Sequence, residues 1–202
     1  MDLVIESVKK LEGLLEHSGC EEGGVLLDVN PDVVNCRYEK GACMSAAFGG
    51  RVADFTTYDP IRARTKISFM FGSPLDTPSV RSAACAIVNV VTGFFCLSRV
   101  HHACSPSSHG PCHEQLGHEL SSKKVWCVGN VPAFESDFRH TLVTGPSDAD
   151  VIIIGGEGII ATDTGDFIET WRKMKRIICI GPSTAGIARL HELEHWCPYG
   201  KS

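Results

Sequence analysis

Three mostly apolar runs in the second half of the chain each stop at glycine. They span residues 124–130, 150–157 and 176–184. Continuous apolar runs of this length are typical of strands buried on both faces, which belong to parallel sheets covered by helices. In open sheets of that kind, ligands bind outside the carboxyl ends of the strands. We therefore predict that the three glycine breaks meet at one edge of a parallel sheet and form the mouth of a ligand site.

Apolar residues recur at helical spacing in two parts of the first half. Residues 3–17 carry one apolar face, which predicts an amphipathic helix. A second helix is predicted from Thr77 to Phe95. Thr77 suits the N-cap position, and Pro78 suits the first turn because its missing N–H would have no partner there.

The rest of the first half predicts a small meander of strands. Residues 25–29 and 33–38 flank a turn-forming Asn-Pro-Asp tripeptide at 30–32, which predicts a hairpin. A further strand is expected at 51–58, after the stretch 43–48 and two glycines. Together with the two helices, these strands predict a small α+β domain.

Hydrophobic periodicity disappears in residues 101–121, where histidine, serine, proline, glycine and cysteine dominate. We expect this segment to connect an α+β domain at 1–100 with a Rossmann-like domain at 122–202. A helix is expected at 164–175, with Met174 among its inward-facing side chains. The predicted fold class is therefore α/β, with a small α+β domain followed by a short parallel-sheet domain.

Composition and missing motifs exclude several function classes. No G-x-G-x-x-G sequence occurs and no acidic residue is placed for a ribose, so neither NAD nor FAD is expected. A net charge of -5 gives no electrostatic reason to expect a nucleic-acid partner. No apolar run is long enough for a membrane span, and the N-terminal stretch predicts an amphipathic helix rather than a signal peptide. A cytoplasmic location is the resulting expectation.

The ten cysteines are scattered along the chain and form no CxxC pair. Without a secretory signal, their thiols are expected to stay reduced. Cys127 and Cys179 fall in predicted strands, and Cys85 and Cys96 are assigned to the apolar helix that begins at Thr77. These four are expected to act as small buried apolar side chains.

Several motifs together resemble the heavy-metal chelation family. They are V-G-N-V-P at 128–132, A-D-V-I-I-I-G-G at 149–156, G-P-S-T at 181–184 and the small-residue helix at 83–89 that follows G-S-P at 72–74. The resemblance implies an enolase N-terminal-like domain ahead of a Rossmann-like domain, with a site where the first closes over the rim of the second. It also implies metal chelation, or the processing of pterin-, flavin- or siderophore-like molecules. The chain departs from the family in a shortened second domain and in the His/Cys-rich segment.

The predicted rim offers backbone and polar side chains to a ligand. The candidate ligand-binding residues are Gly129, Asn130, Gly155, Gly156, Gly181, Pro182, Ser183 and Thr184. Ser183 and Thr184 either bind an anionic or carbonyl group or cap the next helix, and both alternatives stay open. Glu157, which lies among glycines, is a candidate catalytic residue. Asn89 is a second catalytic candidate or a polar clamp between the domains, since a buried amide needs hydrogen-bond partners.

Residues 101–121 are dense in imidazole and thiol side chains. The candidate metal ligands are His101, Cys104, Cys112 and His113. Imidazole and thiolate suit zinc, nickel, iron or copper, so a transition metal is the expected cofactor. The spacing matches no standard zinc finger, and a polar linker is the alternative interpretation.

Three classes of function remain open. The first is an enzyme or binder whose partner at the rim is a small metal-chelating molecule or a metal. The second is a non-catalytic metal-binding protein that uses the His/Cys-rich segment. The third is a cysteine-dependent enzyme that uses Cys104 or Cys112 with a neighbouring histidine. The sequence leaves catalysis and oligomeric state open, a homo-oligomer included.

Overall fold

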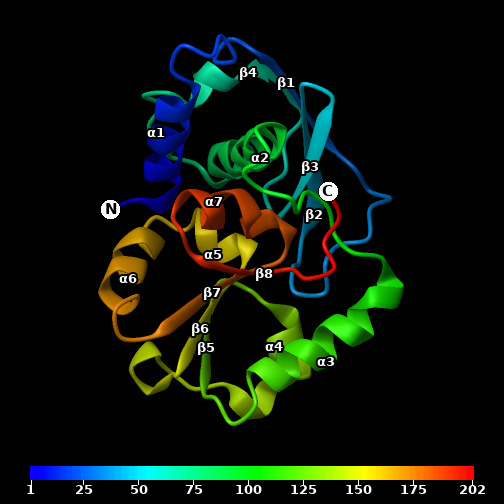
Figure 1. Cartoon of the computed structure of the whole chain (residues 1–202), viewed down its shortest axis with the longest axis vertical. Helices are drawn as coiled ribbons and strands as arrows, with labels where there is room; N and C mark the ends of the chain where they lie inside the picture. The colour runs from blue at the N-terminus through cyan, green and yellow to red at the C-terminus, as the bar shows by residue number, and fades with distance from the viewer.

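The computed structural model describes all 202 residues and places the first four strands in one antiparallel sheet (Figure 1). The strands are β1 (Gly24–Val29), β2 (Ala42–Phe48), β3 (Arg51–Thr57) and β4 (Ala63–Lys66). Their order is β3-β2-β1-β4, so β3 and β4 are the edge strands. Between β2 and β3 the chain turns at Gly49 and Gly50, whose φ angles of 55° and 78° are ones that side chains other than glycine rarely allow.

The second half contains a four-stranded sheet in which all neighbouring strands are parallel. The strands are β5 (Val125–Val128), β6 (Val151–Ile154), β7 (Arg176–Ile180) and β8 (Glu194–Trp196), and they follow sequence order across the sheet. The predicted class, a small α+β part followed by a parallel sheet, is confirmed. Because parallel strands point the same way, the carboxyl ends of β5, β6 and β7 share one edge, and the three glycine breaks lie there.

Seven α-helices connect and cover the two sheets. They are α1 (Leu3–Leu15), α2 (Pro78–Phe94), α3 (His109–Glu119), α4 (Pro132–Ser136), α5 (Gly156–Ile160), α6 (Thr164–Trp171) and α7 (Ala185–Leu190). The N-caps of α1 and α2 are Asp2 and Thr77, whose side chains accept hydrogen bonds from backbone N–H groups of the first turn. None of the helices combines the length and apolar character that crossing a membrane requires.

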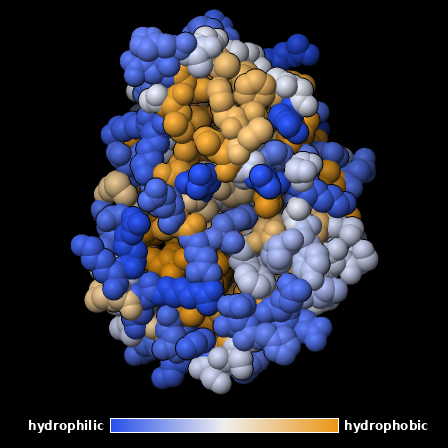
Figure 2. All heavy atoms as spheres, viewed as in Figure 1, coloured by the Kyte–Doolittle hydropathy of each residue, from blue (hydrophilic) through white to orange (hydrophobic).

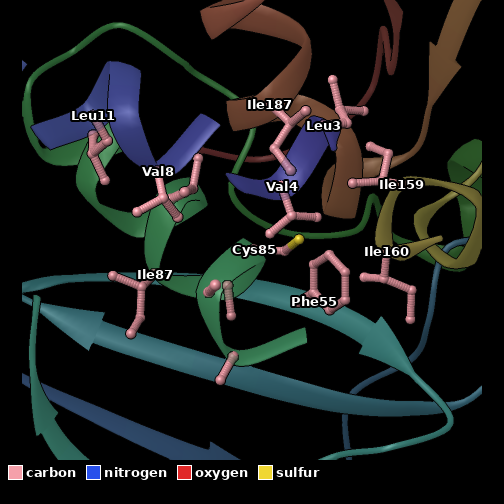
Figure 3. Close-up of a cluster of buried hydrophobic side chains, with 14 of the residues drawn as sticks. Leu3, Val4, Val8, Leu11, Phe55, Cys85, Ile87, Ile159, Ile160 and Ile187 are labelled. Atoms are coloured by element: carbon pink, nitrogen blue, oxygen red, sulfur yellow. The ribbon is translucent and has the colours of Figure 1, made fainter. Parts of the chain in front are cut away.

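One hydrophobic core of 33 residues crosses both halves of the chain. Figure 1 shows α2, α5 and α7 between the two sheets, and Figure 3 shows side chains from both halves meeting there. Val4, Phe55, Cys85, Ile159 and Ile187 are buried members of this core. A second cluster of 14 residues fills the other face of the parallel sheet, toward α3 and α4. The parallel strands are thus covered on both faces, as their continuous apolar sequences predict.

Apolar side chains are exposed mainly over the first half of the chain. Figure 2 shows an apolar area in the upper part of the molecule, between α1 and β3, and a smaller one at the lower left, among mostly hydrophilic side chains. The large exposed apolar residues include Leu14, Leu26, Val52 and Phe95.

The predicted strand at 33–38 is wrong. β1 pairs with β2 on one side and with β4 on the other, so no edge of β1 is left for this segment. Residues 30–41 run irregularly instead, and Cys36 and Tyr38 are buried in the second cluster. Cys36 and Tyr38 therefore contact the second half, whereas Val34 is 54% exposed.

Three smaller expectations also need correction. Much of the segment 101–121 is helical, because α3 buries Cys112 and Leu116 on one face. Cys96 is exposed and lies beyond the end of α2, with a φ of 57°. Met174 is 63% exposed because α6 ends before it. In the last two cases the apolar pattern continues past the residue at which the helix ends.

Candidate functional site

β3 lies across the edge of the parallel sheet where the glycine breaks meet. As an edge strand it has backbone N–H groups without a partner in its own sheet, at every second residue. The N–H of Thr56 donates to Ser183 Oγ at 2.8 Å, and the N–H of Tyr58, just beyond the strand, donates to Glu157 Oε1 at 3.1 Å. Two of the predicted site residues therefore join the two halves of the protein.

The glycines at this edge allow its loops to approach one another. Gly129 has a φ of 80°, and a Cβ there would lie 2.2 Å from the backbone nitrogen of Gly158. A Cβ on Gly158 would in turn lie 2.4 Å from the carbonyl oxygen of Val128. Gly155 and Gly156 are also tight, with a Cβ meeting neighbouring side-chain carbons at 3.0 and 3.1 Å. Close backbone packing alone thus accounts for glycine at 129 and 158.

The Gly-Pro-Ser-Thr loop binds the side-chain carboxyl group of Glu39. The backbone N–H of Ser183 donates to Glu39 Oε1 at 2.9 Å, and a Cβ on Gly181 would lie 2.5 Å from the same oxygen. Glu39 is 8% exposed, and its second oxygen, Oε2, has no hydrogen-bond partner. Burial, opposed by hydrogen bonds from Ser183 and Thr56, raises the pKa of Glu39 to about 7. The anionic group expected at this loop is therefore an internal side chain that the sequence analysis missed.

The two hydroxyls of this loop are buried and bonded inside the protein. Ser183 Oγ accepts from the N–H of Thr56, and Thr184 Oγ1 donates to the carbonyl oxygen of Gly181 at 3.0 Å. Neither side chain caps the following helix, although capping was one of the two alternatives. Pro182 is buried as well.

Asn89 joins α2 to the same loop with both ends of its amide. Its Nδ2 donates to the carbonyl oxygen of Ser183 at 2.9 Å, and its Oδ1 accepts from the N–H of Gly186 at 2.8 Å. The residue is 1% exposed. This geometry is that of the polar clamp, because the amide nitrogen and the amide oxygen both form hydrogen bonds with backbone groups of the second half.

An open corner remains where Tyr58, Asn130 and Glu157 meet. Asn130 Nδ2 donates to the Tyr58 hydroxyl at 3.0 Å, while Asn130 Oδ1 is buried without a partner. Tyr58 is 49% exposed, and Glu157 is half-buried. Burial raises the pKa of Glu157, opposed by the hydrogen bond from the Tyr58 N–H, and the nearby charge of Asp59 adds to the rise. We call these three residues the open corner.

A mostly apolar pocket of about 210 Å³ is lined by Gly129 and Val131, the two chain neighbours of Asn130, but by none of the three residues of the open corner. Val131 and Phe134 form one part of its lining, and Leu142 and Val143 form another. Pockets with apolar walls beside a few polar groups are typical of small-molecule sites. The open corner and this pocket together can accommodate a molecule with one polar and one apolar part.

The four predicted metal ligands do not form a site. Nowhere in the chain are three or more His, Cys, Asp or Glu side chains arranged to hold a metal ion. His101 is buried, with its Nε2 3.2 Å from the carbonyl oxygen of Ser98, and His113 stacks on Phe138 with ring centroids 4.3 Å apart. The helical geometry of α3 explains the second case, because it directs His113 toward the aromatic cluster beside α4.

The remaining thiols of that set, Cys104 and Cys112, lie near the buried Cys36 and the partly buried Cys197. Burial first, and the proximity of other thiols second, raises the pKa of Cys104, and burial raises that of Cys197 to about 12. The Cys112 thiol lies 3.7 Å from the Tyr38 hydroxyl. The raised pKa keeps the thiols of Cys104 and Cys197 protonated at neutral pH, so these two are weak nucleophiles.

The four cysteines expected to be small buried apolar groups divide between burial and exposure. Cys85 and Cys179 are fully buried, Cys127 is partly buried, and Cys96 is exposed.

Comparison of the chain with protein-family models, with characterised proteins and with solved structures found no match. A proposal for its function therefore depends on the geometry of the open corner and on the motifs described above.

Proposed function

We propose that the protein binds a small metal-chelating organic molecule at the open corner formed by Tyr58, Asn130 and Glu157. The observation that carries this proposal is the buried, unpartnered Oδ1 of Asn130 at the seam between the halves. A buried amide oxygen without a hydrogen bond costs about 1–3 kcal/mol, and a ligand N–H or O–H would recover that free energy.

The polar part of the ligand would bind to the amide and the carboxyl group. Asn130 Oδ1 accepts one hydrogen bond, and Glu157, with its raised pKa, accepts or donates according to pH. A molecule with adjacent N–H and C=O groups along one edge matches this pair. Pterins and flavins have such an edge, and both belong to the class that the motif resemblance implies.

The apolar pocket beside Gly129 supports a planar ligand. Phe134, Leu142 and Val143 line a space of about 210 Å³, which is large enough for the ring of a small ligand. In this arrangement the metal is held by the ligand, so the chain itself need not supply a metal site. The proposal is one of binding, and it assigns no reaction.

The proposal is tested by titrating the protein with pterin-6-carboxylate, riboflavin and 2,3-dihydroxybenzoate, each with and without a bound transition metal. We expect at least one of them to bind, and Asn130→Ala to weaken that binding at least tenfold, or about 1.4 kcal/mol. Isothermal titration calorimetry measures the affinity.

Asn30→Ala is the matched control, because Asn30 is exposed in the loop between β1 and β2. Its affinity should equal that of the unaltered chain. If none of the three probes binds, or if Asn130→Ala binds as tightly as the control, the open corner is not the ligand site.

A further inference from the structure

A pocket of about 490 Å³ lies at the other end of β5 from Gly129. The end of α3, the turn that leads into β5, and the segment after α4 enclose it, in the lowest part of Figure 1. None of the three residues of the open corner lines this pocket. It shares Leu142 and Val143 with the pocket beside Gly129, but its polar lining differs, so it is a second candidate site.

The polar lining of this pocket is mainly cationic or hydroxylic. Its polar residues include Ser121, Ser122, Lys123, Lys124, Asp137 and His140. Asp137 is the acidic one among them, and its carboxylate is already paired with the guanidinium group of Arg37. No ion pair engages Lys123 or Lys124. Asp150 accepts a hydrogen bond from the backbone N–H of Lys124 at 2.8 Å. If the Asp150 carboxylate balances one of the two lysine charges, the other still has no counterpart.

Lys123 and Lys124 thus leave one positive charge unmatched at this pocket, on a chain whose formal net charge is -5. Unpaired lysines beside a pocket attract anions and raise their local concentration. The turn itself brings Ser122 to a φ of 61°, a left-handed conformation that also occurs after α1, α2 and α7, at His17, Cys96 and Glu192.

The floor of the pocket is apolar and firmly packed. Leu120 and Phe138 are 1% and 5% exposed, so they form a fixed surface rather than mobile side chains. Leu142 and Val143 continue the apolar lining along the edge of β5. A simple inorganic anion would leave this floor uncovered.

We propose that the pocket between α3 and β5 binds a small organic phosphate, with its phosphate group at Lys123 and Lys124 and its apolar part on Leu120, Leu142 and Val143. Ammonium groups bind phosphate as point charges, and the hydroxyls of Ser121 and Ser122 can donate to its oxygens. The apolar part distinguishes this ligand from free phosphate.

The test is calorimetric titration of the whole chain with phenyl phosphate, inorganic phosphate and phenol. We expect saturable binding of phenyl phosphate, weaker binding of inorganic phosphate, and none of phenol. The double variant Lys123→Met, Lys124→Met should weaken phenyl phosphate binding at least tenfold. Asn130→Ala should leave it unchanged, which keeps this proposal independent of the open corner.

The matched control is Lys9→Met, Lys173→Met, which removes the same charge from exposed sites elsewhere. Thermal melting of each variant establishes that it is folded. Equal loss of affinity in both double variants would show a general charge effect and overturn the site. Absence of saturable phenyl phosphate binding would overturn it too. Equal affinity for phenyl phosphate and inorganic phosphate would overturn the role of the apolar floor.

Discussion

Asn89→Ala is expected to lower the free energy of unfolding by about 3 kcal/mol or more. The change removes the hydrogen bonds to the Ser183 carbonyl and from the Gly186 N–H, and both backbone groups then remain buried without a partner. Each unpartnered buried group costs about 1–3 kcal/mol. The better helix propensity of alanine offsets only about 0.5 kcal/mol of this loss.

Urea unfolding followed by circular dichroism measures the effect. Asn30→Ala serves as the control, because Asn30 is exposed and its side chain accepts only a surface hydrogen bond, from the Asp32 N–H at 3.2 Å, so its change should stay within about 1 kcal/mol. If Asn89→Ala costs less than about 1 kcal/mol, the amide is not a structural clamp and a ligand-binding role for Asn89 becomes the better explanation.

Glu39→Gln is expected to remove a pH dependence of stability. The pKa of Glu39 is about 7 in the folded protein and about 4.3 in the unfolded chain, so the folded protein binds the proton more tightly. Between these two values the unfolded chain carries fewer protons, and the free energy of unfolding therefore falls as pH rises. For a buried carboxyl group shifted this far, the fall amounts to roughly 3 kcal/mol.

Glutamine resembles the protonated carboxyl group and does not ionise, so the variant should match the unaltered chain near pH 4 and exceed its stability above about pH 8. Asp54 is the nearby carboxylate that adds to the rise of the Glu39 pKa, and it is present in both proteins, so the difference between them isolates Glu39. Urea unfolding at both pH values gives this difference. Glu16→Gln, at a 71% exposed side chain, is the control. Parallel stability curves for Glu39→Gln and the unaltered chain would contradict the prediction.

The parallel sheet could be predicted because its signal is local. The unbroken run from Val151 to Ile154 is buried at every position, and such a run fits a strand covered on both faces. The same reasoning fails for residues 33–38, which form no strand. Cys36 and Tyr38 pack with residues of α3 and the parallel sheet, and no local pattern distinguishes that contact from a strand.

The site was only partly predictable. Asn130, Glu157 and Ser183 could be placed at the rim because glycines mark the ends of their strands. The burial of Glu39 could not be predicted, since its partner Ser183 is 144 residues away in the chain. A signal for α3 was present but weak: Cys112, Leu116 and Leu120 recur at intervals of four, and all three are buried.

The position of β3 has a consequence for how the chain is made. During synthesis from the N-terminus, the hairpin of β2 and β3 emerges long before Glu157 and Ser183, which later bond to N–H groups along its free side. Until then the nascent chain exposes a strand able to pair with other polypeptides. We therefore expect the nascent chain to be most prone to aggregation until the segment that carries Glu157 and Ser183 has been translated.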